Sequence, residues 1–193
     1  MDWALYMTMG VVYSNGTLTV KNMLTTGCYC AGNGTEDHVC EDLTWTAWTK
    51  TNSLPESTGN YYLTEDVTIG WMHYLSANDQ KINLDLNGHT VTTGCKTLFM
   101  NHFSGLEYTI TDRSAAQNGK IVATGAFTGG EHGLFAHIGK GNILNLYAGT
   151  IDGSGLSSNS DYGVVLTLVD GGQYNQYNEA VAWFMDYHGL ECL

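Results

Sequence analysis

The feature that most constrains the fold is a strand–turn–strand unit at residues 82–93. Three aliphatic residues alternate there with polar ones at period two, at positions Ile82, Leu84 and Leu86. This alternation is typical of a strand with one buried face. Asn87-Gly88 then supplies a tight turn, and Thr90-Val91-Thr92 resumes the extended pattern. We interpret the unit as one corner of a coil.

Related units recur downstream at irregular intervals of roughly 20 to 35 residues, which lies in the range of solenoid repeats. Each joins a short apolar strand to a Gly, Asn or Asp turn. They are Tyr108–Asp112 with Asn118–Val122, Ile143–Leu146 with Gly149–Gly153, and Val164–Gly172. A single unit of this kind cannot bury its apolar face alone, so the units must stack. The repetition predicts an all-β fold, a right-handed parallel β-helix of about four to five coils.

The amino-acid composition is typical of a strand-rich protein and argues against a nucleic-acid partner. The 24 Gly and 12 Tyr accompany only 13% charged residues, a profile of short strands and turns. Because 19 Asp and Glu outnumber 7 Lys and Arg, the net charge is −12, and we expect no nucleic-acid partner. No apolar run reaches the roughly 18 to 20 residues of a bilayer span, so we expect no membrane insertion. Residues 1–23 also lack the pattern of a signal peptide.

The sequence predicts three parts. Residues 1–27 form an N-terminal β segment, 28–60 a Cys/His knuckle with a Trp-rich cap, and 61–193 the β-helix. In the first part, Asn15-Gly16 is typical of a hairpin, but the same dipeptide also turns one coil face into the next, and both interpretations stay open. From residue 178 onward, the pattern fits either two helical turns or one more strand.

The most chemically specific feature is a set of three cysteines and one histidine: Cys28, Cys30, His38 and Cys40. In an extended backbone, side chains two residues apart point the same way. The Cys-x-Cys and His-x-Cys pairs therefore make two pincers on one side of a Gly-bearing loop. Three thiolates and one imidazole complete a tetrahedron, which matches structural zinc with no ligand position left for a substrate. The spacing predicts a Zn site.

A disulfide is the competing interpretation, since an exported protein lies where thiols oxidise. Cys28 or Cys30 would pair with Cys40, and the other would bond Cys95 or Cys192 or stay free. Closing a loop of roughly ten residues contributes about 2 to 4 kcal/mol. A zinc knuckle draws on about 10 kcal/mol or more. A segment with hardly any apolar residues needs the larger contribution, which favours zinc, with disulfide and free thiols as alternatives.

Aromatic residues follow the cysteine segment. Trp45 and Trp48 lie three apart, and Tyr61 and Leu63 share one face of a strand. The ends of a stack expose apolar faces that need covering. We expect these residues to cap the first coil rather than to form a ligand platform.

These motifs, taken in order, resemble a known family. Cys-x-Cys-x-Gly, His-x-Cys, Thr-Trp-x-x-Trp, Leu-Pro, Gly-Asn-Tyr-Tyr-Leu-Thr-x-Asp-Val and Leu-Asn-Gly-His-Thr-Val resemble repeat-bearing, secreted proteins of anaerobic Gram-positive bacteria, over roughly residues 28 to 155. In these proteins, a right-handed parallel β-helix follows the cysteine/histidine motif. The resemblance implies this fold and an extracellular or cell-surface location, for which the low charge and abundant Thr, Asn and Gly also argue. We expect the chain to be a segment of a longer secreted precursor.

The leading functional hypothesis is a non-enzymatic, adhesin-like module, a rigid spacer that contacts polysaccharide or host glycan through exposed aromatic residues such as Trp71 or Tyr74. The alternative is a polysaccharide lyase or glycoside hydrolase with Asp112, Asp152 and Glu131 as its carboxylates. Against the enzyme, aspartates in turn sequences usually bind local backbone N–H groups. Arg113 follows Asp112 directly, and we expect it to balance that charge. The sequence does not predict the oligomeric state.

Overall fold

The structure of the chain is a computed structural model. It describes residues 9–14, 17–22, 26–28, 43–70, 74–75, 77–93, 98–101, 103–123, 134–138, 140–152, 165–168, 171–177, 181–186 and 189–192. Over these ranges the chain forms strands, turns and bends but no helix. The predicted all-β class is confirmed. No helix in these ranges has the length and apolar character that crossing a membrane requires.

Most strands belong to three sheets. The first contains β5 (Thr46–Trp48), β6 (Gly59–Leu63), β9 (Lys81–Asp85), β12 (Glu107–Thr111), β15 (Ile143–Leu146) and β18 (Gln173–Gln176). The second contains β7 (Val67–Ile69), β10 (Thr90–Thr93), β13 (Lys120–Ala123), β16 (Thr150–Asp152) and β19 (Val181–Asp186), with β20 (Gly189–Cys192) beyond β19. The third contains β8 (Tyr74–Leu75), β11 (Phe99–Asn101), β14 (Leu134–Ile138) and β17 (Val165–Leu168).

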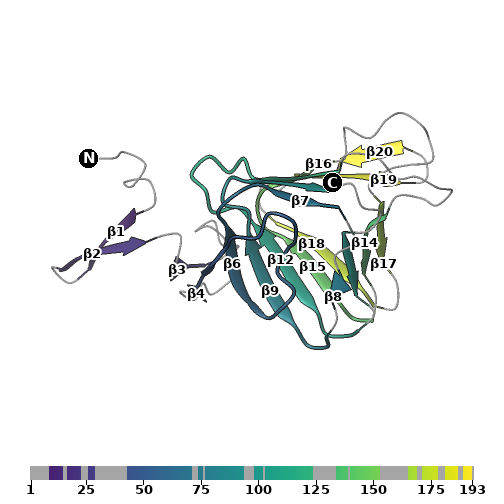
Figure 1. Ribbon diagram of the computed structural model, residues 1–193, viewed down its shortest axis with the longest axis horizontal. Coiled ribbons are helices and arrows are strands. Elements are labelled where there is room, and N and C mark those ends of the chain that lie inside the picture. The colour runs from purple at the N-terminus through teal and green to yellow at the C-terminus, as the bar shows by residue number, and fades with distance from the viewer. Residues whose placement is uncertain are drawn as a thin grey trace.

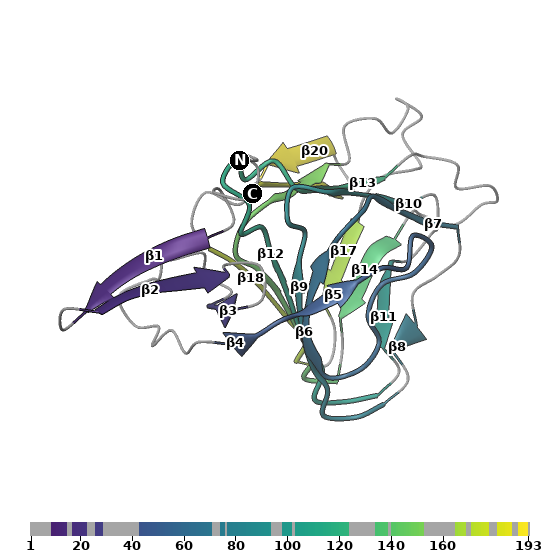
Figure 2. The same cartoon turned by 60° about the vertical axis from the view of Figure 1, so that its left-hand side comes forward.

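The chain visits these sheets in rotation, from β6 to β7 to β8, then to β9, β10 and β11, and so on. We call one passage through the three sheets a round. Every third strand is therefore a neighbour in the same sheet, and apart from the final β19–β20 pair these neighbours are parallel. Figure 1 shows the first sheet as a row of strands, and Figure 2 shows the other two sheets on separate sides. Each sheet is open, with an edge strand at either end.

Equivalent residues of successive rounds stack to form the core. In the second sheet, the parallel register aligns Val67, Val91, Ile121, Ile151 and Ala182, all of them buried. In the first sheet, Leu84 aligns with Ile110 and Leu146. Because parallel neighbours lie about 4.8 Å apart, each aliphatic side chain contacts its equivalents above and below. The inward positions Ile82, Leu84 and Leu86 predicted from the period-two pattern are confirmed, since none of the three is exposed.

Two pairings at the N-terminal side are antiparallel. Strands β1 (Met9–Ser14) and β2 (Thr17–Asn22) flank Asn15-Gly16 and pair with Ser14 opposite Thr17, so the hairpin interpretation of this segment is confirmed. Strands β3 (Thr26–Gly27) and β4 (Leu43–Thr44) also pair antiparallel. Parallel pairing begins with β5, which extends the first sheet ahead of residue 61.

The described part of the C-terminal segment forms strands and not a helix. Residues Val181–Asp186 form β19, which pairs with β16 in parallel, and β20 returns antiparallel to it with Asp186 opposite Gly189. The apolar residues of this segment therefore follow strand geometry. The sequence fitted a helix equally well because the segment is too short to distinguish the period of a helix from that of a strand.

Candidate functional site

The predicted zinc ligands lie mostly outside the described residues, which include Cys28 but not Cys30, His38 or Cys40. Cys28 follows β3 directly and is half-buried. The β3–β4 pairing places Gly27 opposite Leu43, so it joins the two ends of the cysteine-rich insert. Within the part of the chain that the structure describes, no three His, Cys, Asp or Glu side chains gather in a way that could hold a metal ion.

Asp112, a carboxylate of the enzyme hypothesis, is enclosed in a turn. Its side chain is completely buried. One oxygen accepts hydrogen bonds from the backbone N–H groups of Gly88 and Ser114, each at 3.0 Å, and the other accepts the N–H of Gly119. Gly88 belongs to the preceding round, whereas Ser114 and Gly119 belong to the turn that Asp112 itself begins. The carboxylate therefore fastens one round to the next, and no face of it is open to a substrate.

The structure does not bring Asp152 or Glu131, the other two carboxylates of the enzyme hypothesis, together with Asp112 in a described site. Asp152 ends β16 in the second sheet, where it is half-buried. Glu131 lies outside the described residues. Of the two predicted glycan contacts, Trp71 also lies outside them, and Tyr74 is the first residue of β8.

A buried ion pair lies beside the same turn. Asp85 at the end of β9 accepts a 2.8 Å hydrogen bond from Nε of Arg113, whose side chain is only 7% exposed. Its other oxygen accepts the backbone N–H groups of Arg113 and Asn87, each at 2.9 Å. Burial raises the pKa of the Asp85 carboxyl, and the neighbouring Arg113 guanidinium opposes that rise. Arg113 thus pairs with an aspartate of the preceding round rather than with the adjacent Asp112, which corrects the expected partner.

The guanidinium of Arg113 also stacks on Trp45, at 3.9 Å from the ring centroid. Trp45 is 3% exposed and directly follows β4, so this contact connects the N-terminal segment to the rounds. A cation that is desolvated over an indole ring is stabilised by the ring quadrupole. Trp45 therefore covers the ion pair instead of filling the end of the core.

The face of the first sheet opposite Leu84 and Ile110 carries a row of polar side chains, most of them buried, that no sequence pattern predicted. The parallel register aligns Asn60, Asn83, Thr109, Asn145 and Asn175. Side-chain amides connect neighbours within it, from Asn83 to Asn60 at 2.7 Å and from Asn175 to Asn145 at 2.9 Å. The Asn145 amide also donates to the Thr109 hydroxyl at 3.3 Å. The row joins strands that already share backbone hydrogen bonds, which gives the sheet a second set of connections.

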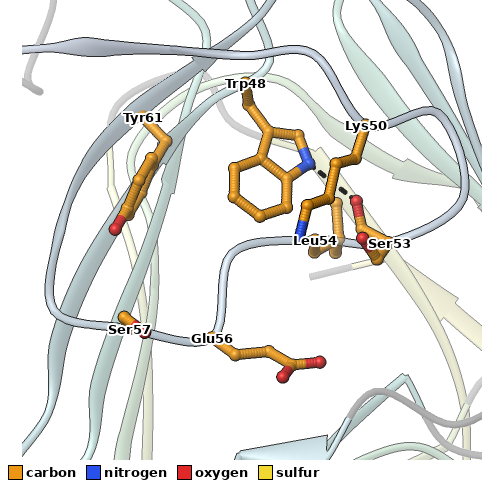
Figure 3. A pocket seen from close by; sticks show the side chains of 7 residues that line it. All are labelled: Trp48, Lys50, Ser53, Leu54, Glu56, Ser57 and Tyr61. Carbon is orange, nitrogen blue, oxygen red and sulfur yellow. Dashed lines mark hydrogen bonds between the residues drawn. The ribbon is translucent and has the colours of Figure 1, made fainter.

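A cavity of about 240 Å³ lies where the first sheet begins. Its walls include the rings of Trp48 on β5 and Tyr61 on β6, and buried Leu54 lies beside them. The loop between β5 and β6 supplies the polar groups of Lys50, Ser53, Glu56 and Ser57. In Figure 3, Trp48 lies above the open space and Glu56 below it, with Tyr61 on the left and Ser53 on the right, and the side chain of Lys50 runs beside the Trp48 ring.

The aromatic wall of this cavity is held in place from several directions. The Trp48 indole N–H donates a 2.7 Å hydrogen bond to the Ser53 carbonyl. Tyr61 meets the Trp48 ring nearly edge to face, with centroids 5.5 Å apart and planes at 77°, and the Lys50 ammonium lies 5.0 Å from the Trp48 centroid. Both rings also pack against the hydrophobic core. This packing agrees with the predicted aromatic cap for these two residues, and the cavity beside them is an additional feature.

The sequence contained one signal for the cavity, namely the aromatic residues Trp48 and Tyr61 on either side of a polar segment. The loop between β5 and β6 folds back to line the cavity with the two rings, and no local sequence pattern indicates that it does so. Comparison of the chain with protein-family models, with curated proteins and with solved structures finds no match.

Proposed function

We propose that the chain is part of an extracellular or cell-surface module, adhesin-like and non-enzymatic, whose stacked rounds act as a rigid spacer with a glycan-contacting surface. The observation that carries this proposal is the rotation of the chain through three parallel sheets, each round adding one strand to each sheet. We infer that the rounds wind as a right-handed parallel β-helix, because crossovers between parallel strands are right-handed in nearly all proteins.

Several contacts support a rigid spacer. Aliphatic side chains stack inside, and amide side chains connect neighbouring strands outside. Asp85 and Asp112 each bond groups of an adjacent round, so successive rounds are joined at the corner as well as within the sheets. In a solenoid, each repeat contacts its neighbours only, and stability is the sum of such interfaces. Extensive contacts between successive rounds are therefore what a rigid spacer needs.

The buried state of Asp112 favours the module over the enzyme. Hydrolysis of a glycosidic bond needs two carboxylates that flank the substrate, roughly 5 to 9 Å apart. Asp112 is one of the three candidate carboxylates, and its oxygens are occupied by backbone N–H groups. Without it, the enzyme hypothesis retains only Asp152 and Glu131.

We also propose a structural zinc site made by Cys28, Cys30, His38 and Cys40. Its support is the β3–β4 ladder, which joins the ends of the segment that contains all four residues. Counted along the sequence from the Gly27–Leu43 pair, Cys30 and Cys40 each lie three positions inside it. Three thiolates with one imidazole form a closed ligand set, so the zinc would stabilise the insert and take no part in chemistry.

The resemblance to repeat-bearing, secreted proteins of anaerobic Gram-positive bacteria remains part of this proposal, together with the location that it implies. Two assays on the purified chain test the module against the enzyme. We expect binding on a glycan array and no release of reducing ends from polysaccharides incubated with the protein. Release of reducing ends, or of unsaturated products that a lyase forms, would favour the enzyme instead. Absence of binding to any glycan would refute the glycan-contacting part of the module proposal.

A further inference from the structure

We propose that the cavity beside Trp48 binds one neutral hexopyranose residue, such as the end of a glycan chain. This inference rests on the proposed glycan-contacting function and gives that contact a location, which differs from the Trp71 and Tyr74 positions expected from the sequence. The size of the cavity fits a single sugar ring. Its volume of about 240 Å³ lies below the range of about 300 to 1,000 Å³ that holds drug-sized ligands. One sugar ring suits such a space, and a longer chain would extend from it into solvent.

The charges that line the cavity balance each other. Lys50 and Glu56 contribute one positive and one negative group to the same cavity, so its formal charge cancels. A ligand with a net charge would be attracted by one group and repelled by the other, and an acidic sugar would also meet the −12 charge of the whole chain. A neutral polyol avoids both effects.

The polar groups of the cavity include both hydrogen-bond donors and acceptors. The Lys50 ammonium only donates, the Glu56 carboxylate only accepts, and the hydroxyls of Ser53 and Ser57 do both. Sugar hydroxyls donate and accept as well, so each can find a partner among these groups. Hydrogen bonds to charged groups are the stronger kind, which makes Glu56 and Lys50 the main contacts of the proposed site.

The aromatic wall of the cavity is preorganised. The Trp48 ring is fixed by its bond to the Ser53 carbonyl and by the neighbouring Tyr61 and Lys50. Gly59 allows the Tyr61 side chain to lie close to the backbone, since a Cβ atom at position 59 would come within 2.8 Å of the Tyr61 hydroxyl. A wall that is already ordered loses little side-chain entropy on binding, which raises affinity. The C–H face of a pyranose ring would pack against these rings, while its hydroxyls face the loop.

The test is titration calorimetry of the intact chain with methyl glucopyranoside, methyl galactopyranoside and methyl mannopyranoside, and with glucuronate and glucosamine as charged probes. We expect at least one neutral glycoside to bind more tightly than either charged sugar. Glu56→Gln should weaken that binding about tenfold, because it replaces a charge-assisted hydrogen bond by a neutral one. Lys50→Met, which keeps an unbranched apolar stem near Trp48, should weaken it by a similar factor.

Matched controls are Glu65→Gln and Lys120→Met, which change the same charges at exposed positions outside the cavity. Both should bind like the unmodified chain. Unchanged affinity in Glu56→Gln and Lys50→Met, or tighter binding of glucuronate than of every neutral glycoside, would overturn the cavity assignment. If the glycan array were positive and these two variants kept its signal, the cavity would be wrong and the module proposal would stand. A chain that bound neither the array nor any monosaccharide would refute the cavity assignment and the glycan-contacting part of the module proposal.

Discussion

Replacement of Asp112 tests most sharply whether this carboxylate is structural. Asp112→Ala removes the acceptor of three backbone N–H groups, those of Gly88, Ser114 and Gly119. The Gly119 bond is buried and the other two are partly buried. A buried donor left without a partner costs about 1 to 3 kcal/mol. We assign about 2 kcal/mol to Gly119 and about 1 kcal/mol to each of the others, and expect unfolding free energy to fall by about 4 kcal/mol.

The matched variant is Asp112→Asn, which has nearly the same shape. Its carbonyl oxygen can still accept the Gly88 and Ser114 N–H groups, but its amide would face the Gly119 N–H, donor against donor. The loss should therefore be about half that of alanine, near 2 kcal/mol. Urea denaturation followed by far-UV circular dichroism measures both, with exposed Glu65→Ala as the control expected to stay within about 0.5 kcal/mol of the unmodified chain. A loss below about 1 kcal/mol for Asp112→Ala would refute the structural role.

Three further predictions address other contacts. Asp85→Ala should lower the free energy of unfolding by about 3 to 5 kcal/mol, because it removes the buried carboxylate that accepts the 2.8 Å bond from the Arg113 guanidinium. A loss no larger than that of an exposed aspartate would contradict this. Gly119→Ala should cost about 1 to 3 kcal/mol, since a Cβ atom would lie 2.7 Å from Leu86 Cβ and from an Asp112 oxygen; thermal melting checks it, and an unchanged midpoint would contradict the packing. Elemental analysis with thiol titration should find one zinc per chain and unreactive thiols at the proposed ligands, whereas absence of metal with a mass lowered by disulfide formation would refute the zinc site.

Much of the fold could be predicted from local patterns, and the reason is the stacking itself. Ile82, Leu84 and Leu86 alternate with polar residues because one face of their strand is buried, and the same alternation recurs in each round. The Gly, Asn and Asp turns mark where the chain passes from one sheet to the next. In contrast, β5 contains only three residues, too few to show a period, so its place in the first sheet was not predicted.

The contacts that join rounds could not be predicted in the same way. Arg113 is adjacent to Asp112 in sequence, yet its ion pair is with Asp85, because the parallel register brings the end of β9 beside the end of β12. The amide row that includes Asn83 and Asn145 depends equally on register. A shift of one residue would have placed these side chains inside the core, and sequence period alone does not fix the pairing between strands. The cavity beside Trp48 requires the return of a whole loop, for which no local signal exists.

Parallel stacking of successive rounds is the claim on which the rest depends, and NMR of isotopically labelled protein tests it directly. We expect methyl–methyl contacts in the order Val67–Val91–Ile121–Ile151, without the strong Hα–Hα contacts of antiparallel neighbours between these strands. Strong Hα–Hα contacts between β10 and β13 would contradict the account, as would the absence of methyl contacts between Val91 and Ile121.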